Sequence, residues 1–476
     1  MIKTSSTKTV IGESYGHHDG AVCVLEHYGI GQARIVFAEH TERCTGIKHD
    51  SSRHPSGKPF IKLYGAKSAF YERPLVKNTR RFLSGEKWEK RPKHNHYINH
   101  HWSHAAASYY TKPWAPHIEP VCVVIDAIGE FDTASIWFRK KKVWSMKYPN
   151  SLGLFYSSVT QACGMQPNRD EHLTMALSAY GNKEPELIGD FAALVDTNLH
   201  RGFGENYIKS IRSIYTNGQI ARAGQIILEE EIMKIMKIAR KYSDHLCYGG
   251  GVALNCVTNT KVASMFTDTW IFPNPGDAGA ALGAAAAVMD KQIWFEDLYL
   301  GREGQIKTEK YNPREIAQSI IDNEMAGLTI GKGEFGPRAL GNRSLLGDPR
   351  KHQTKIKTFK DRKWYSPLAP AVLEEHFDEH FTGPKSKYMS YVNKVNHSTA
   401  QEFPSIIHLD NTARVQVVEE KCSSPLRAVL EEFYELTGVP FLINTSLNEK
   451  HKPMPQSNFR MEEKEKLEVI GEFKIY

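Results

Sequence analysis

Short apolar runs rich in β-branched residues alternate with longer helical stretches through roughly the first 290 residues, and this alternation constrains the fold most strongly. The runs "ARIVFAEH" and "PVCVVIDAIGEFDTASIWF" are typical of strands, and the second predicts a hairpin around Gly129. Apolar residues at three- and four-residue spacing predict a helix over 220–242, and small residues predict another over 278–290. We therefore expect an α/β protein with helices packed on sheets.

The same pattern restarts near residue 300. A helix and a strand are followed by "GKGEFGPRALGNRSLLGDPR" at 331–350, then by the helical "SPLRAVLEEFYELTG" and the strand-like "VPFLINTSLN". The 476 residues, 41% of them hydrophobic, are enough for two or three domains with proper cores. We predict one domain over 1–300 and a second over 301–476, and we see no internal sequence repeat.

Composition narrows the setting of the chain. No stretch approaches the roughly 20 apolar residues of a membrane span, and the first residues lack the apolar core of a secretory signal, so a cytoplasmic protein is expected. The seven cysteines include no CxxC pair, which favours reduced thiols. The net charge of +7 favours anionic partners. Basic segments at 77–97 and 139–147 carry aromatic residues and suit nucleic-acid binding, although a solvated charged face is the simpler interpretation.

The first half holds candidate metal ligands. His100 and His104 in "INHHWSHAAAS" would share one face of a helix, a spacing that chelates a divalent metal, although such pairs also serve in packing. Asp126 ends a strand and Asp277 begins a helix, positions from which carboxylates converge on one cleft. His18 in "GHHDGAVCVL" is either a substrate contact at this cleft or part of a turn.

Other residues suit anionic ligands. A strand that runs into Gly249, Gly250 and Gly251 can present backbone N–H groups to a phosphate or nucleoside, and a tight turn explains these glycines equally well. Arginines set among glycines, as at 331–350, suggest a site for a phosphorylated anion. The candidate phosphate contacts in the second half are Arg338, Arg343, Lys360, Arg362, Arg414, Asn444, Thr445, Ser446 and Asn448.

A series of motifs resembles one family over residues 15 to 450. In order, they include "HDGAV", "EHTERCTGIKHD", "INHHWSHAAAS", "VVIDAIGE", "GGGVALNCVTN", "PNPGDAGAALGAA", "EFGPRALGNRS" and "NTSLN". Together they resemble the NodU/CmcH family of O-carbamoyltransferases. The resemblance implies an N-terminal actin/Hsp70-like (ASKHA) domain, similar to the tRNA threonylcarbamoyl transferase catalytic subunit, and a C-terminal YrdC-like domain.

The resemblance also implies a two-step reaction. The second domain would form carbamoyl-adenylate from carbamoyl phosphate and ATP, with Mg²⁺, and Arg338 and Arg343 would hold the phosphates. The first domain would transfer the carbamoyl group to a hydroxyl with the help of a metal, usually Fe²⁺. The implied metal ligands are His100, His104, Asp126 and Asp277; His18 would lie near the carbamoyl group, and Gly249 to Asn255 would bind the adenylate.

The sequence departs from this family at several points and leaves the acceptor open. Leu173 stands where Lys is expected, Ser366 stands where Arg is expected, and the residues after "NTSLN" diverge. The compact basic chain resembles a viral variant, which would act in the host cytoplasm on 5-hydroxymethylcytosine in DNA. A small-molecule alcohol, a tRNA threonylcarbamoyl transferase activity and a non-catalytic nucleotide-binding scaffold are the alternatives, and relatives often form homodimers.

Overall fold

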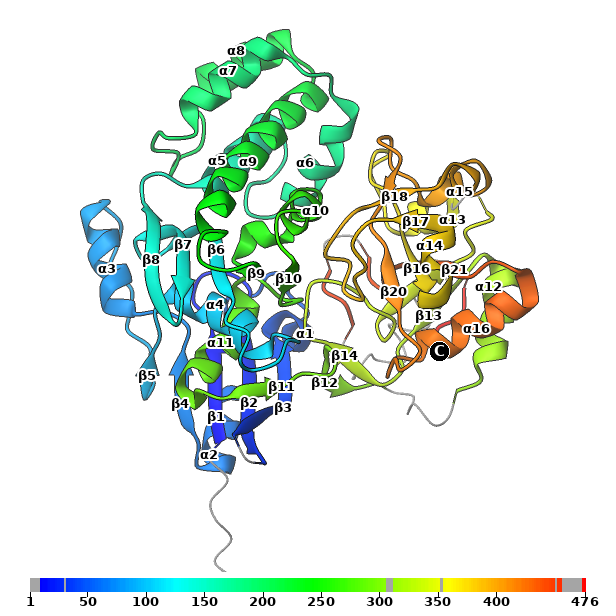
Figure 1. The fold of residues 1–476 in the computed structure, drawn as a ribbon, viewed down its shortest axis with the longest axis horizontal. Coiled ribbons are helices and arrows are strands. Elements are labelled where there is room, and N and C mark those ends of the chain that lie inside the picture. The colour runs from blue at the N-terminus through cyan, green and yellow to red at the C-terminus, as the bar shows by residue number, and fades with distance from the viewer. Residues whose placement is uncertain (1–8, 30, 305–310, 352–353, 450–451, 456–472) are drawn as a thin grey trace, which may run out of the picture. The chain divides into compact units, whose positions relative to one another are not determined.

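The structure, a computed structural model, describes residues 9–29, 31–304, 311–351, 354–449, 452–455 and 473–476. The chain forms two compact units (Figure 1). The first unit comprises residues 1–38 and 51–296, and the second comprises 39–50 and 297–476. The α/β fold expected from the alternating pattern is confirmed in both units. The sequence-based division placed segment 39–50 in the first domain, whereas the structure assigns it to the second unit.

The first sheet of the first unit has the strand order β11-β3-β2-β1-β4-β5. Its strands are β1 (Thr9–Ser14), β2 (Ala21–Tyr28), β3 (Gln32–His40), β4 (Lys67–Phe70), β5 (His96–Tyr97) and β11 (Gln292–Trp294). The central strand β1 pairs antiparallel with β2 and parallel with β4, which in turn pairs parallel with β5.

The second sheet repeats this arrangement in the order β10-β9-β6-β7-β8. Its strands are β6 (Val121–Gly129), β7 (Asp132–Phe138), β8 (Lys141–Lys147), β9 (His245–Gly249) and β10 (Asp268–Ile271). The central β6 pairs antiparallel with β7 and parallel with β9, which pairs parallel with β10. The hairpin predicted around Gly129 is therefore confirmed, and the topology is duplicated although the sequence shows no repeat.

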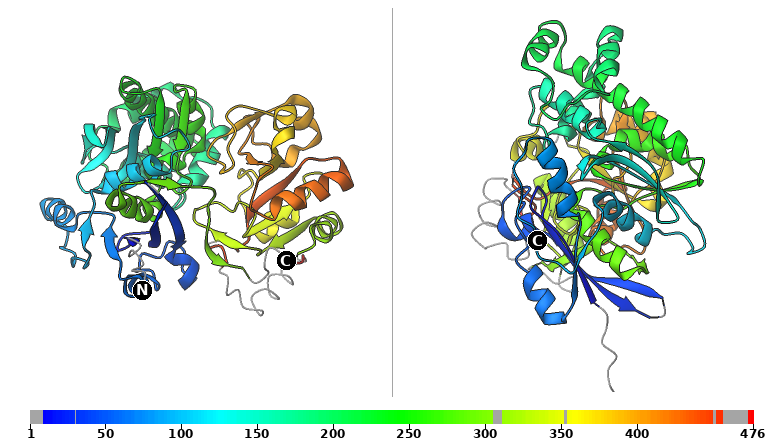
Figure 2. Two further views of the ribbon diagram at one scale, coloured as in Figure 1. Left: turned by 60° about the horizontal axis from the view of Figure 1, so that its bottom comes forward. Right: turned by 90° about the vertical axis from the view of Figure 1, so that its left-hand side faces the viewer.

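Helices pack on these sheets and connect them. They are α2 (Gly57–Tyr64), α3 (Pro74–Leu83), α4 (His100–Thr111), α5 (Leu152–Ala162), α6 (Glu171–Leu177), α7 (Pro185–Leu194), α8 (Glu205–Ile214), α9 (Asn217–Ala239), α10 (Cys256–Ala263) and α11 (Asp277–Met289), with 3₁₀ turns η1 (Ser178–Tyr180) and η2 (Gly251–Leu254). The helices predicted over 220–242 and 278–290 are confirmed as α9 and α11. Helices α7 to α9 lie at one end of this unit, away from β1 and β2 (Figure 2).

Close packing of α4 and α11 positions the candidate site. Helix α11 packs on β1, β2 and β4 and on α4, which itself packs on β6 and β9. Glycine permits this approach, because a Cβ at Gly12 would lie 1.8 Å from the Ala281 carbonyl oxygen, and one at Gly283 would lie 1.7 Å from that of Ser103. The small-residue pattern of 278–290 thus brings the N-terminal halves of the two helices together.

The second unit is built on the sheet β13-β15-β21-β16-β20. The strands of the whole unit, including those outside this sheet, are β12 (Tyr299–Glu303), β13 (Met325–Leu328), β14 (Lys332–Glu334), β15 (Ser344–Gly347), β16 (Ala369–Leu373), β17 (Phe381–Thr382), β18 (Asn393–Val395), β19 (Thr412–Ala413), β20 (Gln416–Val418) and β21 (Phe441–Ser446). Its helices are α1 (Thr41–Thr45), α12 (Pro313–Asn323), α13 (Thr354–Phe359), α14 (Phe377–His380), α15 (His397–Glu402) and α16 (Leu426–Thr437), with 3₁₀ turns η3 (Glu374–His376) and η4 (Pro404–Ile406).

Two further features complete this unit. Arg43 in segment 39–50 donates through Nη2 to the carbonyl oxygen of Gly336 at 2.9 Å, which anchors the segment to the second unit. Most of the divergent C-terminal segment lies outside the described residues, but Phe473 and Ile475 are buried in the core of the unit. None of the helices in the described ranges is long and apolar enough to cross a membrane.

Candidate active site

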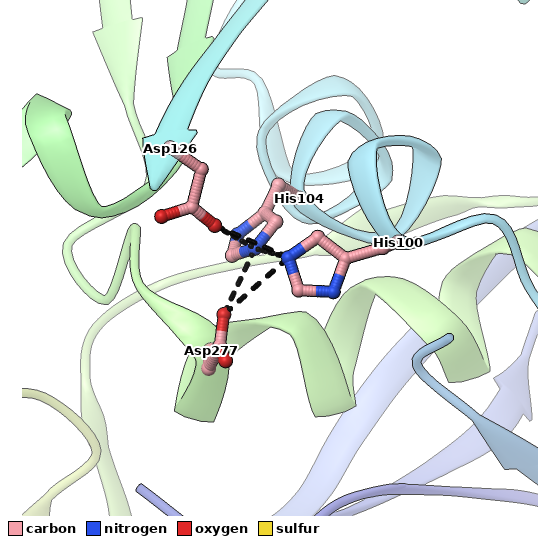
Figure 3. A group of neighbouring side chains, drawn as sticks. All are labelled: His100, His104, Asp126 and Asp277. Carbon is pink, nitrogen blue, oxygen red and sulfur yellow. Dashed lines mark hydrogen bonds and ion pairs between the residues drawn. The ribbon is translucent and has the colours of Figure 1, made fainter. Parts of the chain in front are cut away.

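Helix α4 presents two imidazoles toward a common centre. The helix begins after Asn99, whose side chain caps it by accepting from the Trp102 amide at 2.9 Å. One turn separates His100 from His104, so both rings lie on the same helical face, and their Nε2 atoms are 3.1 Å apart (Figure 3). The predicted placement of both histidines on one helix is confirmed.

Two carboxylates reach the same centre from other elements. Asp126 lies on β6, and its Oδ2 is 3.1 Å from His100 Nε2. Asp277 begins α11, and its Oδ1 is 3.2 Å from His104 Nε2 (Figure 3). One ligand atom from each of the four residues lies within 4.8 Å of all the others. The structure therefore brings together the four residues that the resemblance implies as metal ligands.

The donor set and its spacing fit a divalent transition metal. Ligand atoms about 2.0–2.2 Å from a tetrahedral ion are roughly 3.3–3.6 Å apart, and the four nitrogen–oxygen separations here run from 3.1 to 3.6 Å. His104 Nδ1 lies 2.9 Å from the Pro275 carbonyl oxygen. A neutral ring that donates there leaves the lone pair of Nε2 directed at the centre, which is the usual outer support of a metal-binding histidine.

The carboxylates of the cluster favour a positive charge at its centre. Burial lowers the pKa of His104, but Asp126 and Asp277 outweigh burial and raise this pKa to about 10. Burial raises the pKa of Asp277, whereas His100 and His18 lower it, with a net value of about 2. The buried Asp277 and the half-buried Asp126 thus stabilise a cation between them, and a divalent metal would supply that charge when bound.

Glu130 supports this cluster, and sequence reasoning missed it. This residue is buried at the turn after β6 in the left-handed conformation, with φ of 62°. Its carboxylate accepts from the Arg73 amide at 2.7 Å, from Asn99 Nδ2 at 3.1 Å and from the His100 amide at 3.3 Å. The negative charge therefore lies at the N-terminus of α4, where the helix dipole favours it.

The remaining predicted residues of the first unit surround the cluster. His18 follows β1 and places Nε2 3.9 Å from Asp277 Oδ2. Gly250, at φ of 89°, lies against the end of β6, and a Cβ at Gly251 would be 3.1 Å from Asp126 Oδ1. The Asn255 side chain bonds within the protein, because its Oδ1 caps α10 by accepting from the Thr258 amide at 3.0 Å. The glycine loop therefore adjoins the cluster of His100, His104, Asp126 and Asp277, whereas Asn255 stabilises the helix that follows.

In the second unit, Arg343 is buried inside its own loop. Its Nη1 donates to the carbonyl oxygens of Gly331 at 3.0 Å and Asn342 at 2.8 Å. The buried Glu334 accepts from the amides of Asn342 at 3.0 Å and Arg343 at 3.2 Å. These bonds give Arg343 a role in holding the loop, while Arg338 is half-buried in the same segment. Phosphate binding by both arginines stays a prediction.

Three further cations gather near the end of β21. Lys360 donates to the carbonyl oxygen of Ser446 at 2.7 Å and to Asn448 Oδ1 at 2.8 Å, and Arg362 donates to Thr445 Oγ1 at 3.2 Å. Burial, followed by the charge of Arg414, lowers the pKa of Arg362 to about 10.

In the part of the chain that the structure describes, no carboxylate pairs with these cations. Within the described residues, neither Lys360 nor Arg362 forms an ion pair with a carboxylate, and the buried Nε of Arg414 has no hydrogen-bond partner. Buried cations without acidic partners are costly unless an anion joins them. Asn444 lies beside this group and bonds to Gln416 at 2.6 Å. The structure therefore brings Lys360, Arg362 and Arg414 together, and anion binding by this group stays a prediction.

Comparison with known proteins places the chain in a family. Residues 66–286 match the family described as Carbamoyltransferase N-terminus, and residues 317–470 match Carbamoyltransferase C-terminus. An uncharacterised protein of Methanocaldococcus jannaschii is 31% identical, with 73% of this chain and 68% of that protein covered. Nodulation protein NolO of Bradyrhizobium diazoefficiens is 30% identical, with 76% and 74% covered. An uncharacterised protein of Synechocystis is 27% identical, with 95% and 93% covered.

Solved structures resemble the chain only loosely. Component A of (R)-2-hydroxyglutaryl-CoA dehydratase from Acidaminococcus fermentans is 13% identical with a TM-score of 0.36, over 59% of this chain and 97% of that one. Full-length HypF in its phosphate- and nucleotide-bound form is 12% identical with a TM-score of 0.33, over 61% and 47%. No functional inference rests on overlaps this loose.

Proposed function

Because this chain belongs to the carbamoyltransferase family and is an O-carbamoyltransferase, we propose that it activates carbamoyl phosphate with ATP and then carbamoylates a hydroxyl at the His100–His104 cluster. The first step consumes carbamoyl phosphate, ATP and water, and yields carbamoyl-adenylate, pyrophosphate and inorganic phosphate. In the second step the acceptor oxygen bonds to the carbamoyl carbon while the bond from that carbon to the AMP oxygen breaks.

The activation step belongs in the second unit. Lys360, Arg362 and Arg414 are suited to the phosphates of both substrates. Lys360 and Arg362 donate to neutral oxygens, burial lowers the pKa of both side chains, and a bound phosphate would stabilise their protonated forms. Mg²⁺ bound to ATP would share the neutralisation of the triphosphate. Arg338, in the loop after β14, is the remaining candidate for a direct phosphate contact.

The transfer step belongs at the metal cluster, and the cluster is the observation that carries the proposal. His100, His104, Asp126 and Asp277 would hold a divalent ion, for which Fe²⁺ is our choice. When bound, such an ion supplies a Lewis acid that polarises the carbamoyl carbonyl. His18, near Asp277, would donate a hydrogen bond to the carbamoyl group, and the loop of Gly249 to Gly251 would lie against the adenylate. The Gly250 amide is not available for this contact, because it donates to the Pro275 carbonyl oxygen at 3.0 Å.

The duplicated topology supports an actin/Hsp70-like assignment for the first unit. Both sheets have a central strand flanked by an antiparallel neighbour on one side and parallel strands on the other. For the second unit we retain the YrdC-like assignment as part of the proposal. Homodimer formation and a cytoplasmic location likewise remain proposals.

For the acceptor, internal ion pairs favour a small-molecule alcohol over DNA carrying 5-hydroxymethylcytosine. In segment 77–97, Lys77 pairs with Glu72, and Arg80 and Arg81 pair with Glu86. These pairs neutralise positive charge that phosphate binding would require. Within 139–147, Lys142 pairs with Asp132 in the same way.

Mass spectrometry of acceptors tests this proposal. The enzyme, loaded anaerobically with Fe²⁺, is incubated with ATP, Mg²⁺, carbamoyl phosphate and either DNA containing 5-hydroxymethylcytosine or a panel of sugars and polyols. We expect an acceptor heavier by one carbamoyl group, and loss of that product in Arg338→Ala. Modified DNA would identify the nucleic acid as the acceptor. In a second reaction, the enzyme is given tRNA and threonylcarbamoyl-adenylate. If this reaction modified the tRNA while every acceptor in the first stayed unmodified, the tRNA activity would replace our proposal.

A further inference from the structure

A cavity in the first unit lies beside the metal cluster. It has a volume of about 70 Å³ and is lined by Tyr15, Gly16, Phe70, Glu72, Pro74, Lys77, Asn78, Glu89, Lys90 and Pro92. This volume holds several water molecules, or the hydroxyl-bearing end of a larger molecule. The rest of such a molecule would extend beyond the cavity.

Two connections tie the cavity to the cluster. Tyr71, between the lining residues Phe70 and Glu72, packs its ring on His100 with centroids 5.3 Å apart, and its carbonyl oxygen accepts from Ser103 of α4 at 2.9 Å. The turn that follows β1 lines the cavity with Tyr15 and Gly16, and two residues later it places His18 near Asp277. Glu72 also interacts electrostatically with both His100 and Asp277.

Hydrogen bonds and ion pairs order the polar wall of the cavity, which is buried at Lys77 and partly exposed at Glu89. Lys77 is 8% exposed and donates to Glu72 Oε1 at 2.9 Å, and its Nζ lies 3.4 Å from Glu89 Oε2. Asn78 fixes the loop that carries Glu89, because it donates to the carbonyl oxygen of that residue at 2.9 Å and accepts from its amide at 3.0 Å. Lys77 therefore engages Oε1 of Glu72, and within the described residues no hydrogen bond to Oε2 of this lining residue is recorded.

The remaining wall is aromatic and apolar. Tyr15 and Phe70 meet edge to face with ring centroids 5.0 Å apart, and Pro74 and Pro92 add apolar surface. The lining carboxylates, Glu72 and Glu89, are matched by the ammonium groups of the buried Lys77 and the exposed Lys90, so the wall has no excess positive charge to attract a phosphate. An uncharged hydroxyl donor fits this combination of carboxylate, ammonium and aromatic rings.

We propose that this cavity receives the hydroxyl-bearing end of the acceptor, and that Glu72 binds the reacting hydroxyl and takes its proton. The inference rests on the proposed carbamoyl transfer. As the acceptor oxygen bonds to the carbamoyl carbon, its proton moves to Glu72, the bond between that carbon and the AMP oxygen breaks, and AMP leaves with the electron pair. Lys77 keeps Glu72 oriented. Burial raises the pKa of the Glu72 carboxyl, against the opposing effect of Lys77, which favours proton uptake.

Glu72→Gln tests the assignment, because the amide keeps the size of the side chain but accepts no proton. The matched control is Glu86→Gln, which removes a carboxylate that pairs with Arg80 and Arg81 but does not line the cavity. Each enzyme is given ATP, Mg²⁺, Fe²⁺ and carbamoyl phosphate. The probes are glycerol, myo-inositol, methyl glucoside and free 5-hydroxymethyl-2′-deoxycytidine, and both pyrophosphate and carbamoylated product are measured.

We expect Glu72→Gln to release pyrophosphate at the wild-type rate and to bind the metal normally, but to lower kcat/KM for transfer by roughly 100-fold or more. Glu86→Gln should transfer normally. Two results would overturn the cavity assignment alone. In the first, Glu72→Gln transfers the carbamoyl group at the wild-type rate. In the second, the wild-type enzyme releases pyrophosphate but carbamoylates none of the probes. An absence of pyrophosphate from the wild type would instead overturn the proposed function on which the inference rests.

Discussion

Replacing Glu130 by alanine should weaken both the fold and metal binding. Three hydrogen bonds to the carboxylate would be lost, from the amides of Arg73 and His100 and from the side chain of Asn99. Bonds to a charged acceptor contribute about 1.5–3 kcal/mol each. The Arg73 side chain is 45% exposed, so its ion pair adds no more than about 1 kcal/mol. We expect a loss of about 4 kcal/mol, after allowing for water that replaces part of the bonding.

The effect on the metal distinguishes positioning from general stabilisation. Glu130 fixes the first turn of α4, which carries His100, and loss of such support typically weakens metal affinity about 10–100-fold. The assay is titration with Co²⁺, followed by its visible absorption, alongside urea unfolding. The control is Asp132→Ala in the same hairpin, which removes a buried carboxylate that pairs with the partly exposed Lys142, without touching α4.

Asp132→Ala should therefore lower stability and leave Co²⁺ affinity intact. If Glu130→Ala also lost stability with unchanged Co²⁺ affinity, the reasoning that Glu130 positions the ligand helix would be refuted. Glu130→Gln provides an intermediate case, since one oxygen still accepts while the charge is removed. We expect it to lose about half as much stability as the alanine variant.

Three further predictions concern other parts of the chain. Arg362→Met should abolish carbamoyl-phosphate-dependent pyrophosphate release, measured with a coupled assay, while Co²⁺ affinity stays at its wild-type value; normal release would contradict the anion site. Gly250→Ala should cost at least about 2 kcal/mol in urea unfolding, because φ is 89° and the new Cβ would lie 2.2 Å from the Ile125 carbonyl oxygen; Gly189→Ala, with nothing within 4 Å, should be neutral or stabilising. Burial raises the pKa of Glu42, but Lys48 and other neighbours lower it to about 2, below the ordinary 4.5; the resulting stability, about 3 kcal/mol, is present above about pH 4.5 and lost as pH falls toward 2, and acid unfolding of Glu42→Gln should lack this dependence.

Local patterns predicted the helix that carries His100 and His104. The spacing of His100 and His104 requires only the helical period, and the strand and turn signals around Asp126 and Asp277 mark positions where side chains converge. The small residues of 278–290 likewise predicted a close-packed helix, and Gly283 shows the reason, since α4 occupies the space of a side chain.

The sequence alone did not predict contacts between residues that lie far apart in the chain. Glu130 carries no motif of its own, and its importance depends on Arg73 and Asn99, which are distant in the chain. Segment 39–50 belongs to the second unit, and one of its contacts there is the hydrogen bond from Arg43 to Gly336, which spans 293 residues. The duplicated sheets share strand order without shared residues, so only the pairing of strands reveals them.

The most direct test of two separate chemical steps is exchange of radiolabelled pyrophosphate into ATP. We predict exchange that requires carbamoyl phosphate, persists in Asp277→Asn and is lost in Arg362→Met, because activation would use the cations of the second unit and not the metal cluster. An absence of exchange in the wild-type enzyme, or its equal loss in both variants, would contradict this division of the reaction.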